Sequence, residues 1–321
     1  MKFVSLSEAY IGPLLELWNR ELGEQFPMRE RLLRQNCFED VNLLEAGSWL
    51  AVDESAGNEL RGFVVSKKWT DRREGIEFPE DTGWIQALLV DSRYRGRGIG
   101  SDLIDLAEQA LKEQGASKIE LGNDLHRRMF PGIPLPNIEA VRWFERRGYK
   151  DFATITDLLR IYEEAESMEL PALEGVTIRF VHAAERERIE SFLHKHFPGR
   201  WDYLTRQYWE HGGTGREYMI MEQGDELIGF CRVNDSHSPL LTQNIYWAPL
   251  FADELGGLGP LGIDPAFRGK GYGAAIVQAG IAMLRQRGIR SIVIDATQIA
   301  DFYEKLGYRI WRKYGMYRKL L

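Results

Sequence analysis

Two glycine-rich turns with the same pattern are the features of this 321-residue chain best suited to do chemistry. Glycines at alternate positions let the backbone turn tightly, so that neighbouring N–H groups point outward together. Each turn precedes a stretch of helical period, whose first N–H groups and positive end add to these donors. The turns therefore predict anion-binding sites, with Arg97 and Lys270 adding positive charge at the rim.

The spacing of the glycines argues against two other phosphate-binding patterns. A dinucleotide fingerprint requires G-x-G-x-x-G, and here the third glycine comes one residue early. A Walker A loop requires Ser or Thr after its lysine, but Lys270 is followed by Gly271. A tight turn without a ligand is the alternative for one copy. Two copies in the same strand-turn-helix context favour a binding site.

The turns belong to an internal repeat. VDSRYRGRGIGSDLIDLAEQAL (90–111) reappears as IDPAFRGKGYGAAIVQAGIAML (263–284), and AVRWFERRGY, ending at Tyr149, reappears as ADFYEKLGY, ending at Tyr308. Two linked blocks in the same order indicate a duplicated domain rather than a solenoid. The acidic segment EEAESMELPALE separates the copies. We therefore expect domains over 1–165 and 166–321.

Hydrophobic periodicity predicts the same order of elements in both halves, with strands before the glycine-rich helix and one β-α-β passage after it. The predicted fold class is α/β with a mixed sheet, in two tandem domains. Strands are expected near 2–6, 48–53, 60–68, 84–90, 118–122, 152–162, 177–181, 217–222, 227–233, 259–263, 291–296 and 309–321. Helices are expected near 10–22, 28–37, 98–114, 137–147, 183–196, 201–210, 271–287 and 298–306.

Composition limits the partners. The formal net charge of −7 argues against a general nucleic-acid binder and mildly favours an amine-bearing partner. No apolar run approaches the roughly 18 residues of a membrane span, and the N-terminus does not resemble a signal peptide. Cys37 and Cys231 are too few for a disulfide framework. We expect a cytoplasmic protein, monomeric or homodimeric, without a metal, nucleic-acid or membrane partner.

The pattern R-G-x-G-x-G between a strand and a helix resembles the acetyl-CoA pyrophosphate loop of the GNAT acyltransferase superfamily. FYEKLGY resembles that family's second signature, where a helix after the fifth strand packs beside the thiol of CoA. The resemblance covers both halves and is similar to tandem GNAT proteins such as the mycothiol synthases. It implies two tandem acyl-CoA N-acyltransferase domains.

The resemblance also implies which residues bind CoA. Backbone amides of each glycine-rich turn would hold the pyrophosphate, and the end of the preceding strand would pair with the pantetheine arm. These residues are Leu88, Leu89, Val90, Arg95, Gly96, Arg97, Gly98, Ile99, Gly100, Ser101 and Asn137 in the first half, and Leu261, Gly262, Ile263, Arg268, Gly269, Lys270, Gly271, Tyr272, Gly273 and Ala274 in the second.

The same comparison makes Tyr303 the general acid that protonates the departing thiolate; the alternative is a helix residue that only packs on the sheet. In the first half Phe144 takes this position and cannot donate a proton, although His126, on the long loop after the fifth strand, is a possible substitute. The second domain is therefore expected to do the chemistry, and the first to be structural or an auxiliary CoA site.

The general base is less evident. The strand GGLGPLGI has no carboxylate, and Gly257 stands where mycothiol synthase-like sequences carry a glutamate. Asp253 and Glu254 just upstream are the candidates; a solvated loop acid or a chain of water molecules is the alternative.

The leading hypothesis is an N-acetyltransferase that moves acetyl from acetyl-CoA to a primary amine, on a small molecule or a peptide, by direct attack in a ternary complex. The alternative is a non-catalytic acyl-CoA-binding regulatory protein; an NAD binder is disfavoured by the glycine spacing. His194 and His196 are two apart, which argues against a metal site. Aromatic side chains can bind the amine by cation–π contact or simply pack in the core; they are Trp201, Tyr203, Tyr208, Trp209 and Trp247.

Overall fold

Each glycine-rich turn connects a strand to an amphipathic helix, as the sequence predicts. The first joins β4 (Thr82–Val90) to α3 (Ile99–Glu113), and the second joins β11 (Leu255–Ile263) to α7 (Tyr272–Gln286). The apolar residues of both helices recur at helical spacing and are buried against the sheet. This packing fixes the first turn of each helix at the end of its strand.

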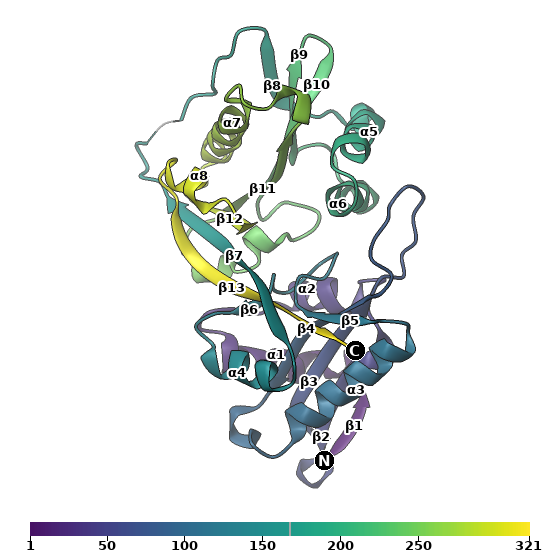
Figure 1. Ribbon diagram of the computed structural model, residues 1–321. Helices are drawn as coiled ribbons and strands as arrows, with labels where there is room; N and C mark the ends of the chain where they lie inside the picture. The colour runs from purple at the N-terminus through teal and green to yellow at the C-terminus, as the bar shows by residue number, and fades with distance from the viewer. Residues whose placement is uncertain (167) are drawn as a thin grey trace. The chain divides into compact units, whose positions relative to one another are not determined.

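The computed structural model describes residues 1–166 and 168–321, which form two compact units (Figure 1). Unit 1 comprises Met1–Arg72, Phe78–Ile155 and Lys313–Leu321, and unit 2 comprises Arg73–Glu77 and Thr156–Arg312. The predicted division at 165/166 therefore does not coincide with the division into compact units.

Unit 1 is built around a mixed sheet in the order β1-β2-β3-β4-β5. All neighbours are antiparallel except β4 and β5, which are parallel. Its other elements are β1 (Lys2–Ser5), α1 (Ile11–Leu22), α2 (Glu30–Leu33), β2 (Trp49–Asp53), β3 (Glu59–Lys68), β5 (Lys118–Leu121), β6 (Ile133–Pro134) and α4 (Ile138–Arg146).

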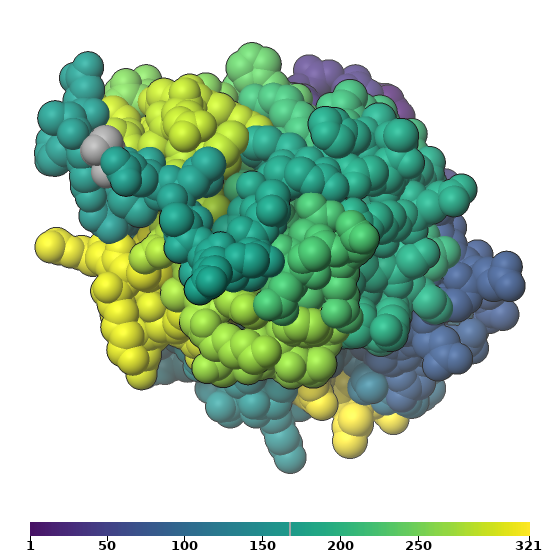
Figure 2. Space-filling view, turned by 90° about the horizontal axis from the view of Figure 1, so that it is seen from above, coloured from purple at the N-terminus to yellow at the C-terminus, as the bar shows by residue number. Residues whose placement is uncertain are grey.

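Unit 2 repeats this plan in the order β8-β9-β10-β11-β12, with β11 and β12 parallel. Figure 2 shows one face of the molecule, on which teal and green residues of unit 2 lie at the surface. Strands β8 and β9 are antiparallel neighbours. Its other elements are β8 (Val176–Phe180), α5 (Arg186–His196), α6 (Arg200–Glu210), β9 (Tyr218–Gln223), β10 (Glu226–Asn234), β12 (Ser291–Thr297) and α8 (Ala300–Glu304).

The two long strands β7 (Lys150–Ile161) and β13 (Arg309–Leu320) each contribute residues to both units. The last residues of the yellow β13 pair with β5 of unit 1, from Tyr317 opposite Leu121 onward (Figure 1). The last residues of β7 pair with β12 of unit 2. Each sheet is thus completed by a strand from the other half of the sequence, which explains why the compact units and the sequence halves differ.

The helix predicted over 28–37 is shorter than expected. After α2 the chain continues as a wider π-helical turn, Arg34–Phe38. Backbone carbonyls of this turn accept hydrogen bonds from side chains: Arg127 donates to Gln35, and Gln86 donates to Asn36. Tertiary hydrogen bonds therefore replace the regular helical pattern here. In the described residues, no helix is long and apolar enough to cross a membrane.

Candidate active site

In the first glycine-rich turn, the Arg95 side chain bonds to the backbone at the end of the preceding strand. Gly96 and Gly98 have φ of 74° and 87°, and a Cβ at either position would have no heavy atom within 4 Å. The Arg95 Nε donates to the Val90 carbonyl at 3.1 Å, and Glu21 accepts hydrogen bonds from Arg95 and Ser92. The first N–H groups of α3 follow directly and have no carbonyl partners within the helix. The turn therefore has the geometry of an anion site.

The second turn has the same construction. Gly269 and Gly271 have φ of 80° and 81°, with open space around both. The Arg268 Nε donates to the Ile263 carbonyl at 3.1 Å, which matches the bond that Arg95 makes in unit 1. The Lys270 Nζ lies 5.2 Å from the centre of the Phe267 ring, so the positive charge of Lys270 lies at the edge of the turn. Both turns thus have the geometry of an anion site.

The parallel strands separate next to each turn. In unit 1, β4 and β5 pair only as far as Ile85 and Leu121, and in unit 2, β11 and β12 pair only as far as Leu258 and Ile294. Beyond these points Leu88–Val90 and Leu261–Ile263 still pair with the strand on their other side. An extended arm can therefore lie against the uncovered edge of β4 or β11, where the resemblance places pantetheine.

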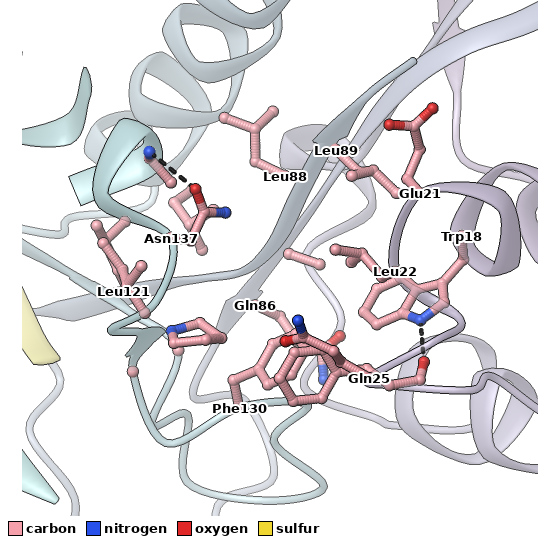
Figure 3. Close-up of a pocket in the computed structure, with 18 of the residues that line it drawn as sticks. Trp18, Glu21, Leu22, Gln25, Gln86, Leu88, Leu89, Leu121, Phe130 and Asn137 are labelled. Atoms are coloured by element: carbon pink, nitrogen blue, oxygen red, sulfur yellow. Dashed lines mark hydrogen bonds between the residues drawn. The ribbon is translucent and has the colours of Figure 1, made fainter. Parts of the chain in front are cut away.

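In unit 1 this gap opens into a cavity of about 400 Å³ (Figure 3). The side chains of Trp18, Leu22 and Gln25 enclose it from α1 and the following loop, and Phe130 lies nearby (Figure 3). Phe144 of α4 also lines the cavity. Because its walls are mostly apolar with few polar groups, the cavity is suited to a small ligand or a flexible arm.

Of the two polar residues considered in unit 1, Asn137 lines this cavity and His126 does not. The Asn137 Oδ1 accepts a hydrogen bond from the Ala140 N–H at 3.1 Å and so caps α4 (Figure 3). His126 is not among the residues that line the cavity; it is buried, with Nδ1 at 3.4 Å from the Asp40 carboxylate. The roles predicted for Asn137 and His126 stay predictions.

A buried polar cluster supports the loop that closes the cavity, a feature that the sequence analysis missed. The Lys67 Nζ lies 2.6 Å from Asp40 and 2.9 Å from Asp124, and it also donates to the His126 and Arg127 carbonyls. All three side chains of this ion pair system are almost fully buried. The two carboxylates raise the pKa of Lys67 against the opposing effect of burial, so the ammonium stays charged.

The same cluster predicts a pH-dependent stability. Burial lowers the pKa of His126 from 6.5 to about 4, although Asp40 opposes the shift. Between these values the unfolded chain binds a proton that the folded chain does not, so stability falls as the pH falls from 6.5 to 4. We expect this group to lower the free energy of unfolding by up to about 3 kcal/mol over that interval. Urea unfolding across the interval measures it.

The asparagine variant isolates the contribution of the imidazole. His126→Asn keeps a polar side chain but cannot titrate, so the slope of stability with pH should flatten. His237 has a side chain that is 73% exposed, and His237→Asn should keep the slope of the unchanged protein. A slope that stays the same in His126→Asn would refute this origin of the pH dependence.

Tyr303 of unit 2 lies on α8 and is 5% exposed. It packs in the apolar core beneath α7, with Leu258, Ile276 and Ile294. Burial raises the pKa of its phenol above the ordinary value, and Cys231 and Asp295 add to the shift. The hydroxyl therefore stays protonated at neutral pH, which is the state that a general acid needs.

The opposite face of the same strands carries polar side chains. The Asn244 Nδ2 donates to the Asp295 Oδ1 at 2.9 Å, and the Asn234 Nδ2 donates to the Gly259 carbonyl at 3.2 Å. Asn244 lies directly on Gly257, where a Cβ would meet its Oδ1 at 2.0 Å. The space beside Gly257 is thus filled by Asn244, and a larger residue does not fit there.

Glu254 lies at the other end of β11, one residue before the strand begins. Its Oε1 accepts hydrogen bonds from the backbone N–H of Ser236 at 3.1 Å and from the Ser236 hydroxyl. Asp253 lies beside it, 64% exposed and 3.8 Å from Arg290. The structure therefore does not bring either acid to the gap between β11 and β12, and a catalytic role for them stays a prediction.

The aromatic residues considered for cation–π binding mostly belong to the core of unit 2. Tyr203, Tyr208, Trp209 and Trp247 are buried. The Tyr208 hydroxyl donates to Glu217 at 2.6 Å, and Trp201 packs on the Phe197 ring. Core packing is thus the role that the structure gives to the buried members.

Two histidines, one cysteine and one acidic cluster have surroundings that disfavour nucleophilic or metal-binding roles. The Nδ1 atoms of His194 and His196 face different aspartates, Asp202 and Asp264. Burial raises the pKa of the Cys37 thiol to about 12, so it is a poor nucleophile. The ligand atoms of Asp235, His237 and Glu254 lie within 4.8 Å of one another, but Arg216 and Arg287 pair with Asp235.

Comparison with known proteins agrees with this geometry. The sequence model of the acetyltransferase (GNAT) family matches residues 11–149 and 181–308. A mycothiol acetyltransferase of Thermobispora bispora is 27% identical over 285 residues, which cover 82% of this chain and 81% of that protein.

Two solved structures have the same fold over 99% of this chain. The glucosamine N-acetyltransferase region of a fungal multi-domain β-N-acetylglucosaminidase has a TM-score of 0.86 at 23% identity, and this chain spans 38% of that longer chain. A tandem GNAT protein from the clavulanic acid biosynthesis pathway has a TM-score of 0.67 at 14% identity, with 98% of that chain covered.

Proposed function

This chain belongs to the acetyltransferase (GNAT) family, and from that premise we propose that it transfers acetyl from acetyl-CoA to the primary amine of a small molecule, by direct attack in a ternary complex. The chain is an N-acetyltransferase with two GNAT domains, and its family uses acetyl-CoA. The observation that carries the proposal is the repeated placement of an anion site beside a gap between parallel strands. That placement suits a pyrophosphate with an extended thioester arm.

The two units have different roles in this proposal. In unit 2 the turn from Arg268 to Ala274 binds the pyrophosphate, Leu261–Ile263 pair with pantetheine, and Tyr303 protonates the departing thiolate. In unit 1 the turn from Arg95 to Ser101 and the cavity beside Leu88–Val90 hold a second CoA arm. Phe144 lines that cavity where unit 2 has Tyr303, so unit 1 lacks the proton donor. The family membership and the phenol in unit 2 argue against a purely regulatory acyl-CoA binder.

The names of the relatives support a class of acceptor to test first. The curated relatives are mycothiol acetyltransferases, and the fungal structure is that of a glucosamine N-acetyltransferase region. Amino sugars and their conjugates are therefore the first acceptors to test, followed by aminoglycosides, small aliphatic amines and peptides. A small or peptide amine also fits the net charge of −7, which favours cationic partners.

Binding of acetyl-CoA is testable without knowing the acceptor. A ligand that binds only the folded state at a hundred times its Kd adds about 2.7 kcal/mol of stability per site. We therefore expect millimolar acetyl-CoA to raise the Tm of the full chain by several degrees, and NAD to leave it unchanged. An unchanged Tm with acetyl-CoA would contradict the proposed function.

Turnover is measured with the same protein. Release of the CoA thiol, followed with a thiol reagent across the amine panel, should exceed the rate without amine for at least one acceptor class. Mass spectrometry of the product should show one added acetyl group. A raised Tm with no thiol release for any amine would support the regulatory alternative.

A further inference from the structure

Asp295 occupies a particular position at the gap in unit 2. Ile294 is the last residue of β12 that pairs with β11, opposite Leu258, and Asp295 follows it directly. The Asp295 Oδ1 lies 3.9 Å from where a Cβ on Gly259 would be, so the carboxylate stands beside the diverging strand. It is partly exposed. A carboxylate is therefore placed where the two parallel strands separate.

The alternation of side chains along β12 decides which face Asp295 occupies. Ile292 and Ile294 pack into the core with residues of α7. Residues one apart in a strand point to opposite faces, so Asp295 points away from α7. The hydrogen bond from Asn244 agrees, because Asn244 lies on Gly257 and donates to Asp295 at 2.9 Å.

Tyr303 belongs to the α7 face, since it packs in the same core as Ile294. The phenol and the carboxylate thus belong to opposite faces of the sheet. The negative charge of Asp295 also contributes to the raised pKa of Tyr303.

From this geometry we propose that Asp295 is the general base that takes the proton from the acceptor's ammonium group, a role that rests on the proposed acetyl transfer. The amine approaches from the face of Asn244 and Asp295, and the thiolate leaves on the face of Tyr303. The Thr242 Oγ1 donates to the Asn244 Oδ1 at 2.6 Å, which orients the amide so that its Nδ2 holds the carboxylate. Asn244 is a positioning residue in this arrangement.

The proton and bond changes balance in this assignment. Asp295 takes one proton from the ammonium and later gives it to water, and the free amine forms a C–N bond to the thioester carbonyl. The C–S bond breaks, and Tyr303 gives its proton to the thiolate. The new amide nitrogen then loses a second proton, which passes to the Tyr303 oxygen. The phenol of Tyr303 is thereby restored. The products are the N-acetylated acceptor, free CoA and one proton in water.

Unit 1 provides an internal comparison. Leu121 is its last paired residue, opposite Ile85, so the position equivalent to Asp295 is Gly122. Gly122 has no room for a side chain, because a Cβ would lie 2.6 Å from the Phe130 carbonyl oxygen. Unit 1 therefore lacks both the carboxylate and the phenol, in agreement with a division of labour between the units.

The test is Asp295→Asn, which keeps an acceptor for the Asn244 hydrogen bond and so preserves the fold. Loss of a general base typically costs about 10²–10⁴-fold, and we expect kcat at pH 7 to fall by about 10²-fold or more. The KM for acetyl-CoA should be nearly unchanged. Raising the pH toward the pKa of the amine should restore much of the rate, because the free amine then needs no base. Asp295→Glu should keep part of the activity.

Asp301→Asn is the matched control. Asp301 is an exposed aspartate in the first turn of α8, two residues from Tyr303, and its removal should leave kcat within a factor of about two. A low-pKa amine such as an alkoxyamine should be acetylated by Asp295→Asn at close to the original rate, since it is already unprotonated at pH 7.

Several results would overturn the proposal. Unchanged kcat in Asp295→Asn would do so, and so would a loss that higher pH does not restore or a large rise in the KM for acetyl-CoA. Activity lost in Glu254→Gln but kept in Asp295→Asn would give the base to Glu254. If the unchanged protein binds acetyl-CoA but acetylates no amine, the proposed function itself fails, which is a separate outcome.

Discussion

Replacing Tyr303 by phenylalanine should lower kcat by about 10²–10⁴-fold, the usual size of a general-acid contribution. The ring stays in the core with Leu258 and Ile294, so CoA affinity and the fold should be nearly unchanged. Burial raises the pKa of the phenol. The same apolar surroundings also destabilise a thiolate, so the proton transfer between them stays close to balance. Steady-state kinetics at saturating acetyl-CoA measure this effect.

Tyr308→Phe is the control for losing a buried hydroxyl. Tyr308 belongs to the same core, and the centre of its ring lies 6.3 Å from that of Tyr303; like Tyr303, it is buried. That variant should change stability more than kcat. If Tyr303→Phe instead lowers the Tm and leaves kcat intact, Tyr303 is a packing residue, and the acid must be water or another group.

The duplication and the chemistry of the turns were predictable from the sequence because both depend on local pattern. Glycines at alternate positions act through backbone geometry alone, and the structure places Gly98 and Gly271 in the left-handed conformation that the turn requires. Two linked blocks with the same spacing leave few folds to consider. Most strand and helix positions followed from periodicity for the same reason, whereas the helix expected over 28–37 is shorter because tertiary hydrogen bonds replace its pattern.

The exchange of strands between halves was not predictable from the sequence. The sequence of β13 is compatible with a strand in either unit. Its pairing with β5 depends on a partner that lies about 200 residues away in the sequence. Tyr317 shows the consequence, since it packs in the core of unit 1 although it lies near the C-terminus. Local patterning fixes which residues form strands and leaves the choice of partner to the tertiary structure.

The buried charges escaped prediction because charged residues are expected at the surface. Lys67 is the second-last residue of β3 and is followed by Lys68, a pattern typical of an exposed strand end, yet it lies buried between Asp40 and Asp124. Asp295 was missed for a different reason: it falls inside the predicted strand 291–296, and a local pattern does not show which groups of the neighbouring strand lie beside it. Its face follows from alternation, but its nearness to the gap requires the register with β11.

A glutamate introduced into each glycine-rich turn should show which unit carries out the acetyl transfer. Gly271→Glu places a carboxylate where the pyrophosphate must approach, and charge-assisted hydrogen bonds are worth about 1.5–3 kcal/mol each. Losing two of them lowers affinity by about 10²–10⁴-fold, because 1.4 kcal/mol is a factor of ten. We expect Gly271→Glu to abolish turnover, and Gly98→Glu to leave catalysis in unit 2 while removing one CoA site from a calorimetric titration.

Gly288→Glu and Gly115→Glu control for backbone strain. Their φ values of 82° and 80° match the 81° of Gly271 and approach the 87° of Gly98, and a Cβ at each would have open space. All four variants therefore carry a similar conformational cost of about 1–2 kcal/mol. Only the two in the turns add charge at an anion site, so a loss of binding confined to them is an effect of that charge.

The pattern of loss across the two turns decides between three arrangements. Turnover abolished by Gly271→Glu and kept by Gly98→Glu places the chemistry in unit 2, beside Tyr303 and Asp295. The opposite pattern would place it at the cavity of unit 1, where Phe144 donates no proton and the thiolate would have to leave unprotonated or take its proton from water. Equal partial losses would mean two working sites, and Tyr303→Phe would then remove only the share of turnover that belongs to unit 2.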